Sequence, residues 1–159
     1  MKIICIGRNY VNHAKELGNA IPSEPLFFLK PSSAIQPKGH PFFIPFFSND
    51  IHYEVELVIK ISKAGKHIEE RFAHNYYSQI GLGIDFTARD IQQECKEKGL
   101  PWEKAKGFDG SAQISRIFID KSSLDLDNIS FSLEKNSEQV QIGNSKEMCF
   151  NFDTIIYVI

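Results

Sequence analysis

Apolar and polar residues alternate from His52 to Ile61, and this period of two is typical of a β-strand, whose successive side chains point to opposite faces of a sheet. One face is apolar and is expected to be buried; it consists of Tyr53, Val55, Leu57, Ile59 and Ile61. The other face carries Glu54 and Glu56. Two carboxylates this close repel each other unless a proton or a cation lies between them. The pair therefore predicts either a solvated strand face or two oxygen ligands of a hard divalent cation.

The next elements follow from short apolar runs and from the glycines and prolines between them. Three further strands are expected, at residues 3–6, 26–29 and 82–86. Residues 68–80 have a helical pattern with Gly81 as the C-cap. Residues 87–90 have the form of a capping box, which predicts a helix that ends at Gly99.

The remaining segments are predicted to be loops and a second group of strands. An ordered loop is expected at residues 37–47, where Pro and Phe interrupt any strand pattern. A glycine-bounded loop is expected at residues 101–111, of a kind that can hold an anionic substrate. Residues 114–152 are expected to form strands with hairpin turns at 135–137 and 143–145. Together these elements predict an α+β fold that is mostly β.

Composition narrows the class of protein. With 159 residues, 42% of them hydrophobic, and 13 Phe, the chain is long enough for one core and is predicted to form a single domain over residues 1–159. A net charge of -2 without a basic stripe argues against nucleic acid as a partner. No apolar run approaches the ~20 residues of a membrane-spanning helix, and the N-terminal run is too short for a signal peptide, so a cytoplasmic protein is expected. Three widely spaced cysteines disfavour a disulfide framework and a zinc site alike.

Four polar residues offer candidate chemistry beyond the two glutamates. Helical spacing brings His13 and Glu16 to one face, either as a surface pair or as a dyad whose carboxylate orients an imidazole that acts as a general base. Asp85 ends a predicted strand next to glycines and is placed either as a ligand or as a cap. Lys30, between an apolar run and Pro31, is expected to reach solvent or to point into a cleft, and reaching solvent is the commoner outcome.

Five segments carry a family resemblance, and they occur in the following order: Gly7–Tyr10 with His13 and Glu16, Phe28–Ser32, His52–Leu57, Asp85–Asp90, and Gly99–Lys106. In this combination the chain closely resembles the fumarylacetoacetate hydrolase family, and within it the acylpyruvase and oxaloacetate decarboxylase branch. The resemblance covers essentially the whole chain. Several motifs in one order are far more specific than any one of them.

The resemblance implies a metal centre and a catalytic dyad. Glu54, Glu56 and Asp85 match three carboxylate ligands of Mg²⁺ or Mn²⁺. A bound cation would make the paired glutamates tolerable. His13 and Glu16 match a dyad, on a mobile lid helix, that activates water.

It also implies a substrate pocket. Lys106 matches the lysine that binds the oxygens of the substrate together with the metal. Arg89 and Gln92 match polar residues that line the same pocket. Lys30 falls within a family motif, but the resemblance gives it no role.

The fold and the reaction implied by the resemblance are specific. The fold is a mixed-sheet, barrel-like roll that assembles as a homodimer. The reaction is metal-dependent cleavage of the C–C bond of acylpyruvates (2,4-dioxo acids), or decarboxylation of oxaloacetate, through a pyruvate enolate. The alternatives are an isomerase of the 2-hydroxyhepta-2,4-diene-1,7-dioate type and a catalytically weak member that binds metal and an oxyacid. Because the family continues beyond the region that matches Phe152–Ile156, a chain ending at Ile159 is expected to bind metal but to turn over poorly.

Overall fold

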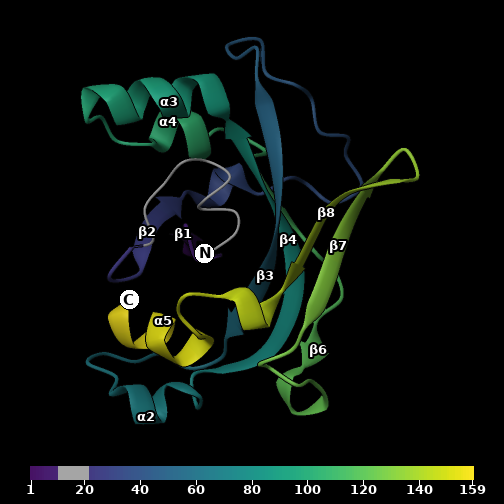
Figure 1. The fold of residues 1–159 in the computed structure, drawn as a ribbon. Coiled ribbons are helices and arrows are strands. Elements are labelled where there is room, and N and C mark those ends of the chain that lie inside the picture. Colours follow the sequence, from purple (N-terminus) through teal and green to yellow (C-terminus); the bar gives the residue numbers. More distant parts are fainter. Residues whose placement is uncertain (11–21) are drawn as a thin grey trace. The chain divides into compact units, whose positions relative to one another are not determined.

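The computed structural model describes residues 1–10 and 22–159 (Figure 1). They group into two compact units. The first unit comprises Met1–Cys5, Phe28–Glu56 and Leu82–Ser115, and the second comprises Ile6–Phe27, Leu57–Gly81 and Arg116–Ile159. The prediction of one domain over residues 1–159 stays a prediction, because two compact groups of residues can belong to one domain.

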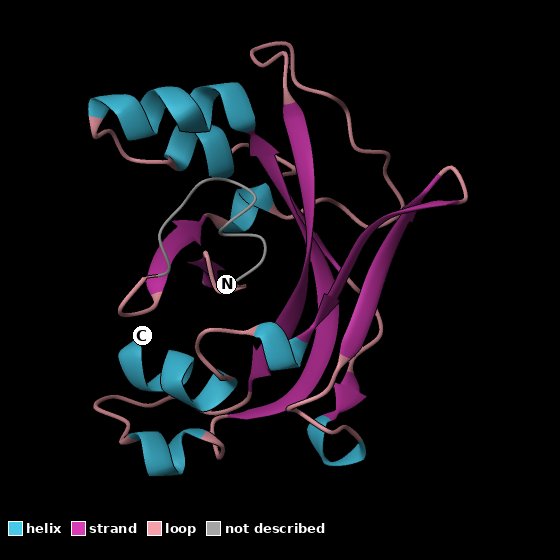
Figure 2. Ribbon diagram, in the orientation of Figure 1, coloured by secondary structure: helices cyan, strands magenta, loops and turns pink. Residues whose placement is uncertain are grey.

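Strands make up most of the regular structure (magenta in Figure 2), which confirms the α+β, mostly β fold class. The strands are β1 (Ile3–Gly7), β2 (Leu26–Lys30), β3 (Ile51–Ile61), β4 (Tyr77–Ala88), β5 (Ala112–Ile114), β6 (Ile119–Asp120), β7 (Ser130–Lys135) and β8 (Glu138–Asn144). The described residues form three sheets: β1 with β2, β3-β4-β5 with β6 added to β4, and the β7-β8 hairpin. The α-helices are α2 (Glu70–Ala73), α3 (Arg89–Lys98), α4 (Glu103–Lys106) and α5 (Phe152–Val158). Three 3-10 helices complete the described elements: η1 (Ser32–Ala34), η2 (Lys121–Ser123) and η3 (Ser145–Glu147).

The core of the second unit lies between β4 and two helices. Its buried side chains are Ala73 of α2, Tyr77 and Ile80 of β4, and Phe152 and Ile156 of α5. Asn151 is the N-cap of helix α5. Its side chain accepts a hydrogen bond from the Thr154 backbone N–H at 2.9 Å and so satisfies one of the free donors of the first turn. The Thr154 hydroxyl also donates to Glu70 at 2.5 Å, which ties α5 to α2.

In the first unit, β4 carries the chain directly into α3. Residues 83–85 pair antiparallel with residues 112–114 of β5, and Asp85 lies opposite Ala112. Helix α3 then ends at Gly99, whose φ of +63° is the left-handed conformation that glycine adopts without strain. The loop at residues 37–47 contains no strand or helix, as predicted, and its Phe42 ring stacks on Phe86 of β4 at 3.8 Å between centroids.

Two predicted helix boundaries are wrong. Residues 68–80 are not one helix, because α2 spans only Glu70–Ala73 and residues 77–80 belong to β4, where they pair with β6 and fill the core. Thr87 does not cap α3. It is fully buried with its hydroxyl turned toward the Asp85 carbonyl, and the N-cap is Ala88. The Asp90 carboxylate instead accepts hydrogen bonds from the Ser48 hydroxyl at 2.6 Å and the Asn49 backbone N–H at 3.0 Å.

Of the two predicted hairpin turns, one is confirmed and one is wrong. β7 and β8 are joined at Asn136 and Ser137, which both have positive φ values of 54° and 67° as a tight hairpin requires. The chain does not turn back at residues 143–145, because β8 continues to Asn144 and η3 follows it. The predicted burial of the apolar face of residues 52–61 is only partly right, since Ile61 of β3 is 52% exposed. Phe27 and Leu29 of β2 are each 50% exposed as well.

Candidate metal centre

Two strands of the first unit bring three carboxylates together. Glu54 and Glu56 lie on β3, and Asp85 lies near the end of β4. One carboxylate oxygen from each residue lies within 4.8 Å of the others. Asp85 is 4% exposed, whereas both glutamates keep partial exposure. The side chains that the sequence marked as a candidate ligand set therefore share one place in the fold.

Two buried lysines hold the aspartate of this cluster. Lys106, at the end of α4, donates to Asp85 Oδ2 at 2.6 Å and to Glu54 Oε2 at 2.9 Å. Lys30, at the end of β2, pairs with Asp85 Oδ1 at 2.7 Å. Both lysines are almost fully buried, with exposures of 3% and 2% respectively. Lys106 thus spans two of the three carboxylates, while Lys30 pairs with one.

Arg89, the first residue of α3, closes the other side of Glu54. Its guanidinium donates one N–H to Glu54 Oε1 and another to the side-chain oxygen of Gln92, which is one turn further along the helix and buried. Its Nε donates to His52 Nδ1 at 3.4 Å, and His52 in turn contacts Asp50 at 3.0 Å. The two residues predicted to line a substrate pocket, Arg89 and Gln92, therefore lie beside the carboxylate cluster.

The charges of the cluster separate the pKa values of its two glutamates. Burial raises the pKa of Glu54, but the positive charges of Lys106 and Arg89 outweigh it and bring that pKa down to about 2. For Glu56, burial and the negative charges of Asp85 and Glu54 act together and raise the pKa to about 8. Although burial works against a charged amine, Asp85 and Glu54 raise the pKa of Lys106, so its ammonium stays charged at neutral pH.

This donor set fits a hard divalent cation. Carboxylate oxygens are the ligands that Mg²⁺ and Mn²⁺ prefer. Among the residues that the structure describes, Glu54 and Asp85 form ion pairs but Glu56 forms none. Burial, together with the negative charges of Asp85 and Glu54, raises the pKa of Glu56, so this carboxyl group needs a proton or a cation. A metal ion that replaced the proton would supply the missing charge.

Comparison with known proteins assigns the family. Residues 2–159 match the family model described as fumarylacetoacetate (FAA) hydrolase C-terminal. The chain belongs to the fumarylacetoacetate hydrolase family. Members of this family are enzymes, among them oxaloacetate decarboxylase, oxaloacetate tautomerase and fumarylpyruvate hydrolase.

Three relatives show how close this member is to others. It is 46% identical over 160 residues to a mitochondrial oxaloacetate decarboxylase of Dictyostelium discoideum, and the aligned residues cover 99% of this chain and 73% of that protein. It is 41% identical over 155 residues to the mitochondrial oxaloacetate tautomerase FAHD1 of Bos taurus, covering 97% and 70%. A solved structure of fumarylpyruvate hydrolase from Pseudomonas aeruginosa in complex with Mn²⁺ and pyruvate has a TM-score of 0.89 and 32% identity, covering 99% of this chain and 70% of that one. At least one member of this family thus binds Mn²⁺.

Two predicted site residues of this family member lie outside the described part of the chain. For a third residue, Lys30, the structure differs from the commoner of the two expected outcomes. His13 and Glu16 fall within residues 11–21 and keep their predicted role as a prediction. Of the two outcomes expected for Lys30, the commoner one, reaching solvent, is wrong. Lys30 is buried against Asp85, and that carboxylate and nearby carbonyl oxygens surround its ammonium. The available signal was its place at the end of an apolar strand. Ser111, a partner of Lys30, gave no signal at all.

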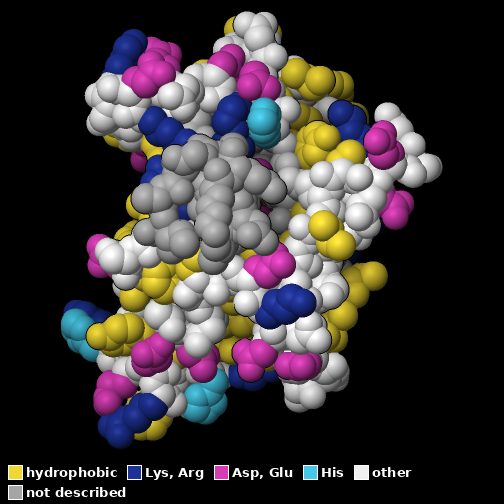
Figure 3. All heavy atoms as spheres, viewed as in Figure 1, with side chains coloured by type: hydrophobic (Ala, Val, Ile, Leu, Met, Phe, Trp, Pro, Cys, Tyr) yellow, Lys and Arg dark blue, Asp and Glu magenta, His cyan; other side chains and the backbone are white. Residues whose placement is uncertain are grey.

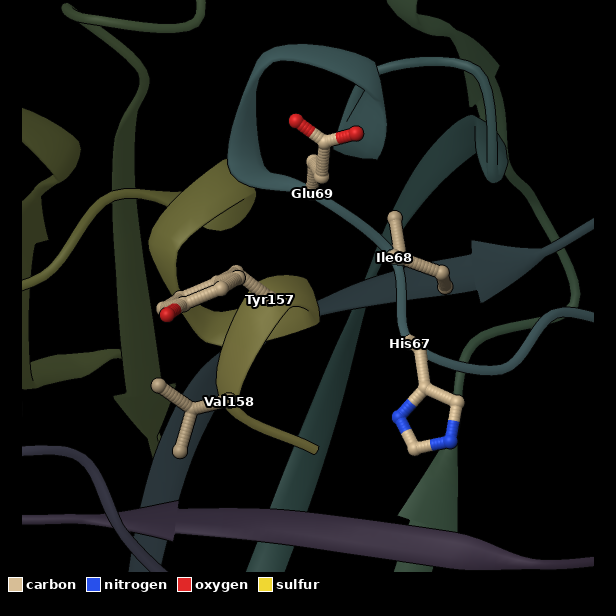
Figure 4. A pocket seen from close by; sticks show the side chains of 5 residues that line it. All are labelled: His67, Ile68, Glu69, Tyr157 and Val158. Carbon is tan, nitrogen blue, oxygen red and sulfur yellow. The ribbon is translucent and has the colours of Figure 1, made fainter.

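A pocket in the second unit contains none of these residues. It is lined by His67, Ile68 and Glu69, which precede α2, and by Tyr157 and Val158 of α5 (Figure 4). Its lining brings together no set of groups that could bind a metal. The candidate site of this enzyme is therefore the carboxylate cluster of the first unit.

Proposed function

We propose that this protein is a metal-dependent enzyme that breaks the C–C bond next to the pyruvate moiety of small 2-oxo acids. The substrates are acylpyruvates, which it hydrolyses, and oxaloacetate, which it decarboxylates. The observation that carries the proposal is the convergence of Glu54, Glu56 and Asp85 on one site beside the Lys106 ammonium. The names of the relatives, oxaloacetate decarboxylase and fumarylpyruvate hydrolase, support this substrate class.

Glu54, Glu56 and Asp85 are the residues that would hold the cation, Mg²⁺ or Mn²⁺. When bound, such a cation supplies a Lewis acid that polarises the oxygens of a 2-oxo acid. Glu56 gives up its proton when the cation binds, since a carboxylate must be ionised to act as a ligand.

Lys106 supports the developing negative charge of the pyruvate enolate. Its ammonium is charged, buried and held at the edge of the carboxylate cluster, so it can donate a hydrogen bond to an enolate oxygen in surroundings that contain little water. Arg89 lies near Lys106 because both contact Glu54, and Gln92 contacts Arg89. Both Arg89 and Gln92 have planar hydrogen-bonding groups suited to a substrate carboxylate. Their proposed role is to orient the substrate.

His13 and Glu16 are proposed to act only in the hydrolytic reaction. His13 takes a proton from water as the water oxygen bonds to the distal carbonyl carbon of the acylpyruvate. The bond between that carbon and C3 then breaks, leaving a carboxylic acid and the pyruvate enolate, which takes up a proton to become pyruvate. Decarboxylation of oxaloacetate breaks the bond to the C4 carboxylate, releases CO₂ and leaves the same enolate, so it needs no activated water.

A second candidate function is tautomerisation of oxaloacetate. Relatives at 41% and 42% identity are named oxaloacetate tautomerases. Interconversion of the keto and enol forms removes a proton from C3 and places one on the C2 oxygen, with no C–C bond broken. Stabilisation of an enolate by Lys106 would serve this reaction as well. The two functions therefore share a site and differ in the bond that breaks.

The assembly and the location are further proposals. We propose a homodimer that acts on a small-molecule 2-oxo acid in the cytoplasm and has no nucleic acid or membrane partner. None of the described helices is long and apolar enough to cross a membrane. Lys and Arg side chains are interspersed with Asp and Glu on the face that Figure 3 shows, which does not favour binding to a polyanion. Both oxaloacetate enzymes compared above are named mitochondrial, so fluorescence microscopy of the tagged protein is the test of its location. Light scattering of the purified protein tests the homodimer.

The test of function is a substrate panel with metal control. Pyruvate release from acetylpyruvate and oxaloacetate, and loss of enol-oxaloacetate absorbance, are measured with Mg²⁺, with Mn²⁺ and after chelation. We expect pyruvate from both substrates only when metal is present. Enol loss without pyruvate release would favour the tautomerase, and no reaction with any substrate in either metal would contradict both functions.

A further inference from the structure

Lys30 has the most completely enclosed charge among the lysines of the candidate site, since its side chain is 1% exposed. Its ammonium, which has three N–H donors, is surrounded by Asp85 Oδ1 at 2.7 Å, Ser111 Oγ at 3.0 Å, the Ser111 carbonyl at 3.1 Å, the Phe86 carbonyl at 3.3 Å and the Lys106 carbonyl. These five protein oxygens can take up all three N–H donors, and the buried side chain leaves none facing solvent. Lys30 is therefore placed to act on the site through Asp85 and not by direct contact with a substrate.

The two oxygens of Asp85 have different partners. Oδ1 faces Lys30, which pairs with no other carboxylate of the cluster. Oδ2 faces Lys106, whose ammonium also reaches Glu54 Oε2 at 2.9 Å. Oδ2 thus shares the Lys106 ammonium with Glu54, whereas Oδ1 is held by a separate, buried ion pair with Lys30. The anchoring of Lys30 to three carbonyl groups makes that pair a rigid one.

We propose that Lys30 restricts Asp85 to binding metal through one oxygen, and that it thereby sets a preference of the site for Mg²⁺ or Mn²⁺ over Ca²⁺. Ca²⁺ takes six to eight oxygen ligands and accepts carboxylates through both oxygens, whereas Mg²⁺ demands an octahedron of single oxygens. If a cation displaced Lys106 from Oδ2 while Lys30 kept its pair with Oδ1, Asp85 would offer the cation one oxygen, which suits the octahedron. The inference rests on the proposed metal centre and adds a positioning residue to it.

The experiment compares two dissociation constants in one protein. Calorimetric titration gives the Kd of Mn²⁺ and of Ca²⁺ for the wild type and for Lys30→Met, which has a similar length but no charge. We expect the wild type to bind Mn²⁺ at least tenfold more tightly than Ca²⁺. In Lys30→Met the ratio of the two Kd values should fall at least tenfold, because Asp85 Oδ1 becomes available to Ca²⁺.

Ser111→Ala is the matched control, because it removes one contact of Lys30 but leaves the Lys30–Asp85 pair. It should lower the melting temperature without changing the ratio. A merely structural role for Lys30 would lower stability in both variants and change the ratio in neither. If Lys30→Met does not fold, Lys30→Gln, which keeps a donor but not the charge, should shift the ratio in the same direction.

The outcomes separate this inference from the proposed function. A wild type that binds neither cation overturns the metal centre and the inference together. A wild type that binds Mn²⁺ but binds Ca²⁺ equally well, or Lys30 variants that keep the wild-type ratio, overturn the role of Lys30 alone.

Discussion

At the scale of single residues, Glu56 is the most costly side chain of the candidate site. It is a carboxylate with two negative neighbours, and the ion pairs of the cluster go to Glu54 and Asp85 instead. Such a group destabilises the folded state when it is ionised, unless a bound cation compensates its charge. A carboxylate with two negative neighbours and no ion pair among the described residues is the pattern expected of a ligand.

Glu56→Gln tests this interpretation. The amide keeps the shape but removes the repulsion, so the metal-free variant should be at least as stable to thermal unfolding as the wild type. Its affinity for Mn²⁺ should fall by about 100-fold or more, because one anionic ligand is lost. Glu103→Gln, at an exposed position of α4, is the control and should change neither property. A marked loss of stability in the metal-free Glu56→Gln protein would contradict the assignment.

The raised pKa of Glu56 predicts a proton release. With a pKa of about 8, Glu56 is mostly protonated at pH 7, and a metal ion must displace that proton. Affinity for Mn²⁺ should therefore rise with pH up to about 8 and level off above it. Calorimetry at pH 7 in two buffers of different ionisation enthalpy should show close to one proton released per metal bound. Equal apparent enthalpies in the two buffers would mean that Glu56 is already ionised.

Under the proposed function, Lys106 is expected to make opposite contributions to metal binding and to catalysis. Its ammonium contacts Glu54 Oε2 and Asp85 Oδ2, so it competes with a cation for the same carboxylates. In Lys106→Met we expect oxaloacetate decarboxylation to fall by about 10²- to 10³-fold, while Mn²⁺ binding is unchanged or tighter. Exposed Lys104 of the same helix, changed to Met, is the control. Weaker Mn²⁺ binding in Lys106→Met would show that the lysine supports the metal site instead.

At the scale of elements, two glycines with positive φ make a matched pair. Gly99 ends α3 with φ +63° and has open space around it, so Gly99→Ala should cost about 1 kcal/mol of stability and leave Mn²⁺ affinity unchanged. Gly110 has φ +75°, and an added Cβ would lie 2.5 Å from Gln36 Oε1. The end of the Gln36 side chain can move away from that Cβ, so the backbone strain at φ +75° is the main effect of the substitution. Because Gly110 precedes Ser111, which supports Lys30, this strain in Gly110→Ala should lower both stability and Mn²⁺ affinity. Thermal unfolding and calorimetry of both variants check this, and an equal loss of affinity in the two would refute it.

The elements also show what the sequence could and could not predict. The alternation at residues 52–61 correctly placed β3, because a period of two leaves little choice of structure. The helix expected at residues 68–80 failed because Tyr77 and Ile80 are fixed by packing against α5, which no local pattern reveals. The prediction that Thr87 caps α3 is wrong because the Thr87 side chain is buried and does not face the first turn of the helix.

The candidate site shows the same division. Glu54, Glu56 and Asp85 could be proposed as one ligand set because the chain resembles the fumarylacetoacetate hydrolase family, whereas the residue pattern alone also allowed a solvated strand face and a helix cap. The burial of Lys30 could not be predicted from the sequence, since its partners Lys106 and Ser111 are 76 and 81 residues away along the chain. A buried charge is defined by groups that only the fold brings together.

At the scale of the whole molecule, the family and the carboxylate cluster point to the same chemistry. The family match spans residues 2–159, and every described side chain predicted for the site lies in the first compact unit. The direct test is a calorimetric titration of the metal-free protein with Mn²⁺, followed by the decarboxylation rate of oxaloacetate at each occupancy. The account predicts one Mn²⁺ per chain in the wild type, none in Asp85→Asn, and a rate that rises in proportion to occupancy. Decarboxylation at full rate by the metal-free protein, or unchanged Mn²⁺ binding in Asp85→Asn, would contradict it.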